Sequence, residues 1–242
     1  MIERLPAGIW HFSAYVWNDA QTEATLAPIQ GIRALPLASG GSYAIPSEPD
    51  CRACHEGAGS PVLGFSALQL SPDRDPLAPH AEPGSAGDAN LLTLVETGRL
   101  INLPHELLDT PPRIQAPTLA GRAALGYLNA NCGQCHADPK LMGAAVPVDI
   151  QLAVDPTDAG AAESIIRTLL ESESRYRSAG AADARLVVPG DSRAGTLLAR
   201  MRSRDPRIQM PPLGSAEPDL EAIALIEHWI EQDLKENKGK DP

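Results

Sequence analysis

Apolar residues recur at helical spacing in one segment near the end of the sequence. Leu220, Ile223, Ile226, Ile230 and Leu234 follow one another at steps of three and four residues. A stripe of this kind predicts an amphipathic helix of about four turns, with one face buried and the other in water. This is the strongest periodic pattern in the chain.

Weaker patterns predict further elements. Apolar and polar residues alternate from Trp10 to Val16, which predicts a half-buried strand. Short helices are expected over Leu91–Arg99 and Leu197–Arg204. A longer helix is expected to begin after an N-cap at Thr118 and to run into Cys132.

Proline and glycine separate these elements. The chain has 23 prolines and 20 glycines among 242 residues, which indicates long, turn-rich connections. The segment Pro72–Asn90 is expected to be a loop, and repeated prolines predict a domain boundary near residues 110–117. We therefore expect two domains, over residues 1–117 and 118–242.

Composition and charge narrow the class of protein. The chain has 20 basic and 31 acidic residues, a net charge of −11, which disfavours binding to nucleic acid or to acidic lipid surfaces. No apolar run is long enough to span a bilayer. Only 4% of the residues are aromatic, so something other than ring packing is expected to fill much of the interior.

All four cysteines belong to two copies of one motif, C-x-x-C followed at once by histidine. Two thiols at this spacing lie on one face of a helical turn, where both can add to the vinyl groups of one porphyrin. The histidine can then turn its imidazole onto the iron as the proximal ligand. The motifs therefore predict two covalently attached haem c groups. Their residues are Cys51, Cys54 and His55, and Cys132, Cys135 and His136.

These cysteines also have alternative interpretations. A thioredoxin-like dithiol would need its C-x-x-C near a β-α-β pattern, which neither copy has. A structural zinc site could use two such pairs, but 77 residues separate Cys54 from Cys132, more than a zinc ribbon or finger needs. A disulfide within either pair would be strained and would stabilise little.

Residues 118–235 resemble a class I cytochrome c domain. They contain in order a helix, the second motif, long loops, Met210 followed by two prolines, and the amphipathic helix. The chain as a whole resembles a bacterial dihaem c-type cytochrome in which a β-rich segment precedes the first haem. The resemblance implies a mainly α-helical fold, with two cytochrome c-like haem domains and a short β-containing N-terminal segment. It also implies contacts of Ala124 and Leu128 with Ile226 and Trp229.

Met210 is the expected distal ligand of the second haem iron. It lies 74 residues after His136, and the prolines that follow it stiffen the loop and fix the approach of its thioether. Met201 falls in an expected helix and is interpreted as core filler. Met142 follows the second motif closely and is awkwardly placed for a ligand.

The distal side of the first iron is less defined. The first half of the chain has no methionine except Met1, so His80 and His105 are the candidate ligands. The alternative for each is a solvated surface histidine, which is also the interpretation for His11 and His228.

Six arginines crowd the stretch before Met210. We expect some of them to pair with haem propionates or to steer an acidic redox partner to an exposed haem edge. The alternative is ordinary solvated charge. These residues are Arg185, Arg193, Arg200, Arg202, Arg204 and Arg207.

Together these patterns predict a periplasmic electron carrier without a membrane span, working with unidentified redox proteins. A periplasmic dehydrogenase is a candidate electron donor. Covalent haem attachment in bacteria takes place outside the cytoplasmic membrane. The first 20 residues show no signal peptide, so we expect the start of the chain to be truncated or removed. One alternative is a peroxidase-like dihaem enzyme with an open distal position at the first haem. The other is a zinc or dithiol protein.

Overall fold

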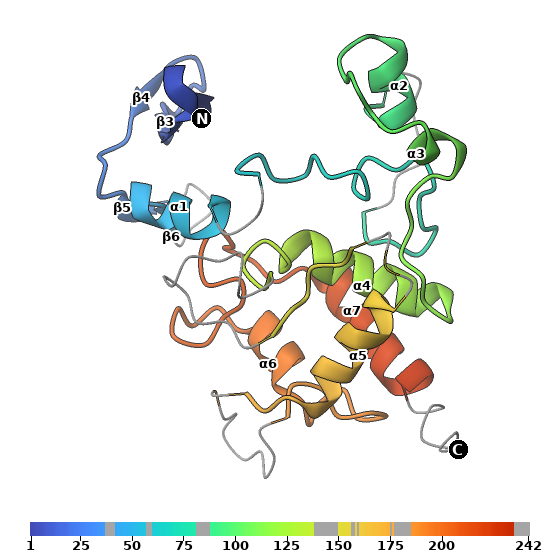
Figure 1. Ribbon diagram of the computed structural model, residues 1–242. Coiled ribbons are helices and arrows are strands. Elements are labelled where there is room, and N and C mark those ends of the chain that lie inside the picture. Colours follow the sequence, from blue (N-terminus) through green and yellow to red (C-terminus); the bar gives the residue numbers. More distant parts are fainter. Residues whose placement is uncertain are drawn as a thin grey trace.

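The computed structural model describes residues 1–36, 42–56, 60–80, 88–137, 150–155, 158, 160–174, 176 and 185–234. Figure 1 shows the helices of the second half gathered together, with the N-terminal strands to one side of them. In the described part of the chain, no helix is long and apolar enough to cross a membrane.

Three antiparallel strand pairs, β1–β2, β3–β4 and β5–β6, form the N-terminal part. The predicted strand from Trp10 to Val16 is split between two of them. The N–H of Ser13 still bonds to the carbonyl of Met1, whereas the carbonyl of Ala14 accepts from Ala27, so the partner changes between these neighbours. The strands are β1 (Ile2–Arg4), β2 (Trp10–Phe12), β3 (Tyr15–Trp17), β4 (Ala24–Leu26), β5 (Ile32–Pro36) and β6 (Ser42–Ile45).

The helices predicted from the sequence are present as α2, α4, α6 and α7, whereas α3 and α5 were not predicted. Helix α4 begins where expected, because the Thr118 side chain accepts a hydrogen bond from the N–H of Gly121 at 2.9 Å. The helices are α1 (Glu48–His55), α2 (Leu91–Glu96), α3 (Glu106–Asp109), α4 (Leu119–Asn131), α5 (Ala161–Glu171), α6 (Thr196–Arg202) and α7 (Leu220–His228), which continues as a π-helical turn over Trp229–Asp233.

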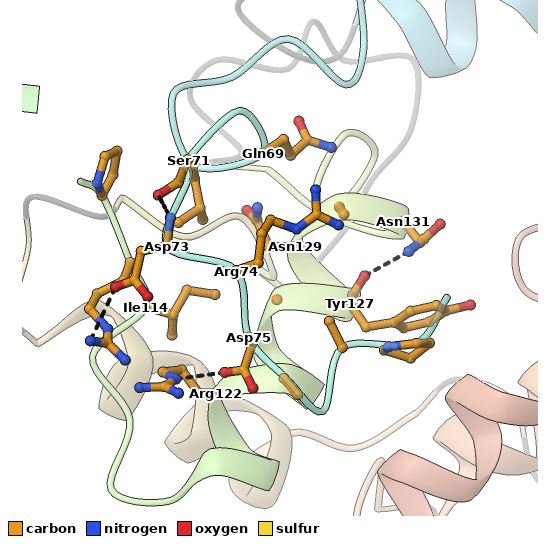
Figure 2. Close-up of a pocket in the computed structure, with 18 residues that line it drawn as sticks. Gln69, Ser71, Asp73, Arg74, Asp75, Ile114, Arg122, Tyr127, Asn129 and Asn131 are labelled. Carbon is orange, nitrogen blue, oxygen red and sulfur yellow. Dashed lines mark hydrogen bonds and ion pairs between the residues drawn. The ribbon is translucent and has the colours of Figure 1, made fainter. Parts of the chain in front are cut away.

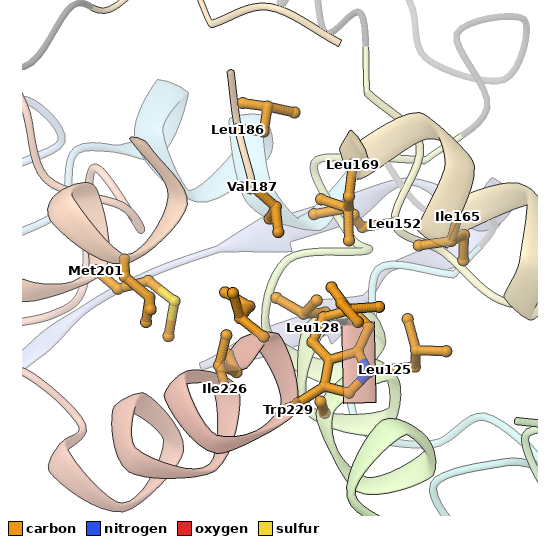
Figure 3. Packing of buried hydrophobic residues seen from close by; sticks show 14 of the residues in the cluster. Leu125, Leu128, Leu152, Ile165, Leu169, Leu186, Val187, Met201, Ile226 and Trp229 are labelled. Atoms are coloured by element: carbon orange, nitrogen blue, oxygen red, sulfur yellow. The ribbon is translucent and has the colours of Figure 1, made fainter. Parts of the chain in front are cut away.

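One hydrophobic cluster joins α4, α5, α6 and α7 (Figure 3). Ala124 and Leu128 of α4 lie in this cluster with Ile226 and Trp229, as the resemblance implies. Gly121 allows the indole to approach α4, because a Cβ at that position would lie 3.2 Å from the Trp229 ring nitrogen. The core therefore forms where α4 meets the end of α7.

The amphipathic helix differs from its prediction at its first residue. Leu220 is 73% exposed, although the periodic pattern assigns it to the buried face. It directly follows the cap residue Asp219, at the end of the helix that the core does not cover. Ile230 and Leu234 are buried beyond the π-helical turn, so the rest of the stripe is as predicted.

Candidate functional site

The first motif lies on α1, which begins with a reciprocal cap. The Ser47 hydroxyl accepts from the N–H of Asp50 at 3.3 Å, and the Asp50 carboxylate accepts from the N–H of Ser47 at 2.9 Å. This capping box fixes the first turn of a short helix. Cys51 and Cys54 follow it at helical spacing, and His55 is the last helical residue.

The second motif lies in the turn that follows α4. The N–H groups of Cys135 and His136 both bond to the carbonyl of Cys132, at 3.1 and 2.8 Å. A Cβ on Gly133 would lie 2.5 Å from the carbonyl oxygen of Asn129 and 3.1 Å from the Cα of Ala153. Glycine at this position therefore lets the segment around residue 153 cross close beneath the motif.

The two motif histidines are held in the same way. The Nδ1 of His55 lies 2.7 Å from the carbonyl oxygen of Pro61, and the Nδ1 of His136 lies 3.2 Å from that of Ile150. A carbonyl can only accept, so each Nδ1 donates, and in a neutral ring of this tautomer the lone pair is on Nε2. Burial lowers the pKa of His136, which favours the neutral ring. An oriented, neutral imidazole with a free Nε2 is suited to bind a metal.

Cys132, His136 and Met210 line one cavity of about 300 Å³. We call it the Met210 cavity. Burial raises the pKa of the Cys132 thiol to about 12, so this thiol is protonated at neutral pH. The N–H of Met210 bonds to the carbonyl of Arg200 at 3.1 Å, which ties the Met210 loop to α6. Four leucines supply apolar wall, namely Leu152, Leu169, Leu186 and Leu197.

Arg204 also lines the Met210 cavity and has an unused donor. Its terminal nitrogens bond to the carbonyls of Met201, Ser203 and Glu217, but its buried Nε has no hydrogen-bond partner among the residues that the structure describes. A buried donor without a partner is costly unless an acceptor fills the space. The lining of the cavity thus combines a thiol, a neutral imidazole, a thioether, an apolar wall and a cationic donor. This set of groups fits a haem c group with its propionates.

The six arginines before Met210 divide into two groups. Arg200 and Arg204 line the Met210 cavity, and burial lowers the pKa of Arg200. The other four do not line it. Arg202 pairs with Glu227, Arg207 pairs with Asp205, Arg185 forms a β-bridge with Glu173, and Arg193 is exposed.

The remaining methionines lie as follows. Met201 on α6 is buried in the hydrophobic cluster and also borders the Met210 cavity. Met142 lies outside the described residues.

His80 and His105 bond to carboxylates in other parts of the structure. The Nε2 of His80 lies 3.1 Å from the Asp219 carboxylate at the start of α7, and this hydrogen bond raises the pKa of His80. The Nδ1 of His105 lies 3.1 Å from Asp109. The ring that lies beside His55 is that of Phe12, with the ring centres 5.7 Å apart. Among the described contacts, none brings His80 or His105 to His55.

One contact between the two motifs has no signal in the sequence. The thiol of Cys135 donates a hydrogen bond to the carbonyl oxygen of Ala53, in the first motif on α1, at 3.9 Å. Interaction between the two thiols lowers the pKa of Cys54 and raises that of Cys135. The second motif therefore approaches α1 through Cys135.

Comparison with known proteins gives no match to a family model, a curated protein or a solved structure. The site must therefore be interpreted from its own geometry. Across the described ranges, no group of three or more His, Cys, Asp and Glu side chains is arranged to hold a metal ion. The zinc alternative needs four such ligands together, and the described side chains do not form that set as they stand.

A second pocket, of about 320 Å³, lies between α4 and residues 68–79 (Figure 2). Two ion pairs attach this segment to α4 and to the chain that leads into it. Asp75 contacts Arg122 at 2.6 Å, and Asp73 contacts Arg113 at 3.1 Å. The pocket does not include the motif cysteines or histidines, although it shares Tyr127 and Asn131 with the Met210 cavity.

Proposed function

We propose that the protein is a periplasmic dihaem c-type cytochrome that carries electrons between redox proteins, with a periplasmic dehydrogenase as a candidate donor. The observation that carries this proposal is the Met210 cavity, where Cys132, His136 and Met210 meet although the sequence separates them widely. A cysteine for attachment, a neutral histidine and a methionine around an apolar space are the donor set of a His/Met haem c. The duplicated motif extends the proposal to a second haem.

Each residue has a separate task in this proposal. Cys51 and Cys54 would hold one haem and Cys132 and Cys135 the other, each pair through two thioether bonds. His55 and His136 would be the proximal ligands, and their carbonyl partners keep the rings from rotating.

The distal side of the second site would use Met210. Its soft thioether favours the ferrous state and so raises the reduction potential. The leucine wall excludes water from this side, and the free Nε–H of Arg204 would bind a propionate. When bound, each haem supplies an iron that takes up and returns one electron.

The function is tested by reductive titration of the protein after export and haem maturation. A carrier takes up two electrons per molecule reversibly, and both ferric irons are low-spin. Met210→Leu is expected to abolish the low-spin signal of the second site, because leucine cannot bind iron. Met201→Leu, a matched change in the same cavity, is expected to leave it intact. Irreversible reduction, or a low-spin signal that survives Met210→Leu, would count against this proposal.

A peroxidase-like enzyme is the second candidate. It is favoured by the side-chain contacts of His80 and His105, which are engaged with Asp219 and Asp109 rather than with the first motif. An iron with only His55 as protein ligand would have an open position for a small molecule such as peroxide. A high-spin signal at the first site, converted by peroxide and restored by electrons from the second site, would favour the enzyme over the carrier.

A further inference from the structure

The pocket of about 320 Å³ between α4 and residues 68–79 has no part in the proposed function. We call it the Arg74 pocket. Its outer wall is fastened on both sides of Arg74, because Asp73 and Asp75 form ion pairs with arginines in α4 or just before it. The wall is held again at His80, which bonds to a carboxylate at the start of α7. A wall fixed in this way preforms the pocket, so a ligand would not have to order it.

The charges that line the Arg74 pocket do not cancel. Asp75 pairs with Arg122 at 2.6 Å. Asp73 pairs with Arg113 at 3.1 Å. Arg74 is the one other charged side chain of the lining, and within the described part of the chain its guanidinium has neither an ion pair nor a hydrogen bond. One positive charge is therefore left to attract an anion.

Neutral donors lie beside this guanidinium. Figure 2 shows the side chains of Gln69, Arg74 and Asn129 gathered on one side of the pocket. The side-chain oxygen of Gln69 accepts from the Ser66 hydroxyl at 3.0 Å, and that of Asn129 accepts from the N–H of Val154 at 2.8 Å. Because these bonds use the oxygens, both amide NH₂ groups keep their donors for a ligand.

A buried hydroxyl and an apolar wall complete the lining. Ser71 is 3% exposed, and its oxygen accepts from the N–H of Asp73 at 3.2 Å, so its own proton can be donated to a ligand. The apolar wall consists of Leu68, Ile114 and Ala123. A cation, two amides and a hydroxyl beside an apolar wall match a short carbon chain that carries one carboxylate and several hydroxyl groups.

We propose that the Arg74 pocket binds a small hydroxycarboxylate, whose carboxylate contacts the Arg74 guanidinium and whose hydroxyl groups contact Gln69 and Asn129. A guanidinium binds a carboxylate through two parallel hydrogen bonds. A phosphate ester fits less well, because its second negative charge would lie near Asp73 and Asp75 without a further unpaired cation in the lining. The proposal does not depend on haem, since the motif cysteines and histidines do not line this pocket.

Isothermal titration calorimetry of the exported protein tests this site with D-gluconate as the probe. Gluconate is expected to bind at one site with a Kd of about 1 mM or tighter, which is the affinity that ordinary ligand efficiency gives for about 13 non-hydrogen atoms. Sorbitol lacks the carboxylate and acetate lacks the hydroxyl groups, so each is expected to bind at least about tenfold more weakly. No saturable binding of gluconate, or equal binding of sorbitol or acetate, would overturn the proposal.

Two arginine variants locate the binding. Arg74→Gln is expected to weaken gluconate binding by about tenfold or more, because the charge-assisted hydrogen bonds to the carboxylate are lost. Arg74 is exposed, so the substitution is expected to leave the fold intact. Arg99→Gln makes the same change of charge at an exposed arginine outside the pocket and is expected to leave the affinity unchanged. An unchanged affinity in Arg74→Gln, or equal losses in both variants, would overturn the proposal.

A substitution on α4 tests the opposite wall of the pocket. Asn129→Asp keeps the oxygen that accepts from Val154 but replaces the amide donor with a negatively charged acceptor. It is expected to weaken gluconate binding by about tenfold or more, because the new carboxylate repels that of the ligand. Gluconate affinity equal to that of the natural protein would place the ligand elsewhere and overturn the proposal.

Discussion

The chain before Ile114 (the first region) and the chain from Ile114 onward (the second region) differ in how far their apolar side chains are buried. Among the described residues, only Phe12 and Leu91 are buried hydrophobic residues of the first region, whereas the second contains the whole hydrophobic cluster. The reverse holds for exposed large hydrophobic residues, which lie in the first region with the exceptions of Leu119 and Leu220. The second region can therefore fold around its own core, and the first needs apolar surface from elsewhere.

Two sources could supply that surface to the first region. One is contact with the second region, through Asp75 and Arg122 and through His80 and Asp219. Among the described residues before Ile114, only Leu68 packs against the hydrophobic cluster itself. The other is a haem at the first motif, which would offer a large flat apolar face to α1 and its neighbours. The comparison thus predicts that haem binding matters more for the folding of the first region than for that of the second.

Removing the first haem is the largest expected perturbation of this difference. The double variant Cys51→Ser with Cys54→Ser is expected to make the chain before Ile114 sensitive to protease, while the second region stays resistant, because a ligand stabilises the fold that binds it. Limited proteolysis with mass analysis of the fragments measures this. Equal digestion of both regions, or no change in the first, would contradict the comparison.

Two tryptophans give a matched test of the core. Trp229→Ala is expected to lower the free energy of unfolding by about 3–5 kcal/mol, because the side chain is 1% exposed and central to the cluster. Trp17→Ala, at a side chain that is 61% exposed, is expected to change it by less than about 0.5 kcal/mol. Urea unfolding measures this free energy for both variants. Similar losses of unfolding free energy in the two variants would contradict the difference between the regions.

Two glycines of α4 test the packing of Trp229 against this helix, with smaller expected effects. Gly121→Ala is expected to cost about 1–3 kcal/mol, because its Cβ would lie 2.9 Å from the capping oxygen of Thr118 and 3.2 Å from Trp229. In Gly126→Ala the new Cβ would contact only Ile114, at 3.8 Å. This substitution is expected to stabilise the protein by about 0.5–1 kcal/mol, because alanine has the higher helix propensity. Urea unfolding that gives both substitutions the same sign would show that Trp229 does not pack against α4 in this way.

The smallest expected effect concerns the link between the regions at His80. Asp219 raises the pKa of His80, so the stability from this pair is present below the usual pKa near 6.5 and is lost as pH rises through the raised value. The pKa of Asp219 is lowered, so that stability is also lost in strong acid. His80→Ala should therefore lower the urea midpoint at about pH 6 and match the natural protein at about pH 9. His11→Ala, at the exposed residue of β2, serves as the control. A difference between His80→Ala and the natural protein that does not depend on pH would contradict the ion-pair account.

The sequence predicts much of the second region because its signals are local. The Thr118 cap, the stripe that includes Ile223 and Ile226, and the motif itself each lie within a few turns of helix. Helix α5 also has an apolar stripe, at Ala161, Ile165 and Leu169, but it begins at Gly160 without a side-chain cap. Spacing alone could have identified it.

Other features depend on contacts between distant segments. The strand pairs are three to five residues long, too short for alternation to define where one ladder ends and the next begins. The side-chain contact of His80 with Asp219 and the contact of Cys135 with the carbonyl of Ala53 join segments far apart in the chain. No local pattern encodes such contacts. The convergence of His136 and Met210 on one cavity was predicted only through the resemblance to cytochrome c domains.

The measurement that tests the central claim most directly is the intact mass of the protein, exported with an added signal peptide in a host with cytochrome maturation machinery, together with its pyridine haemochrome spectrum. The account predicts a mass gain of two haems and a c-type spectrum. Each double substitution of motif cysteines should then remove one haem. A mass equal to that of the unmodified chain would contradict the account and direct attention to the zinc content of the same sample.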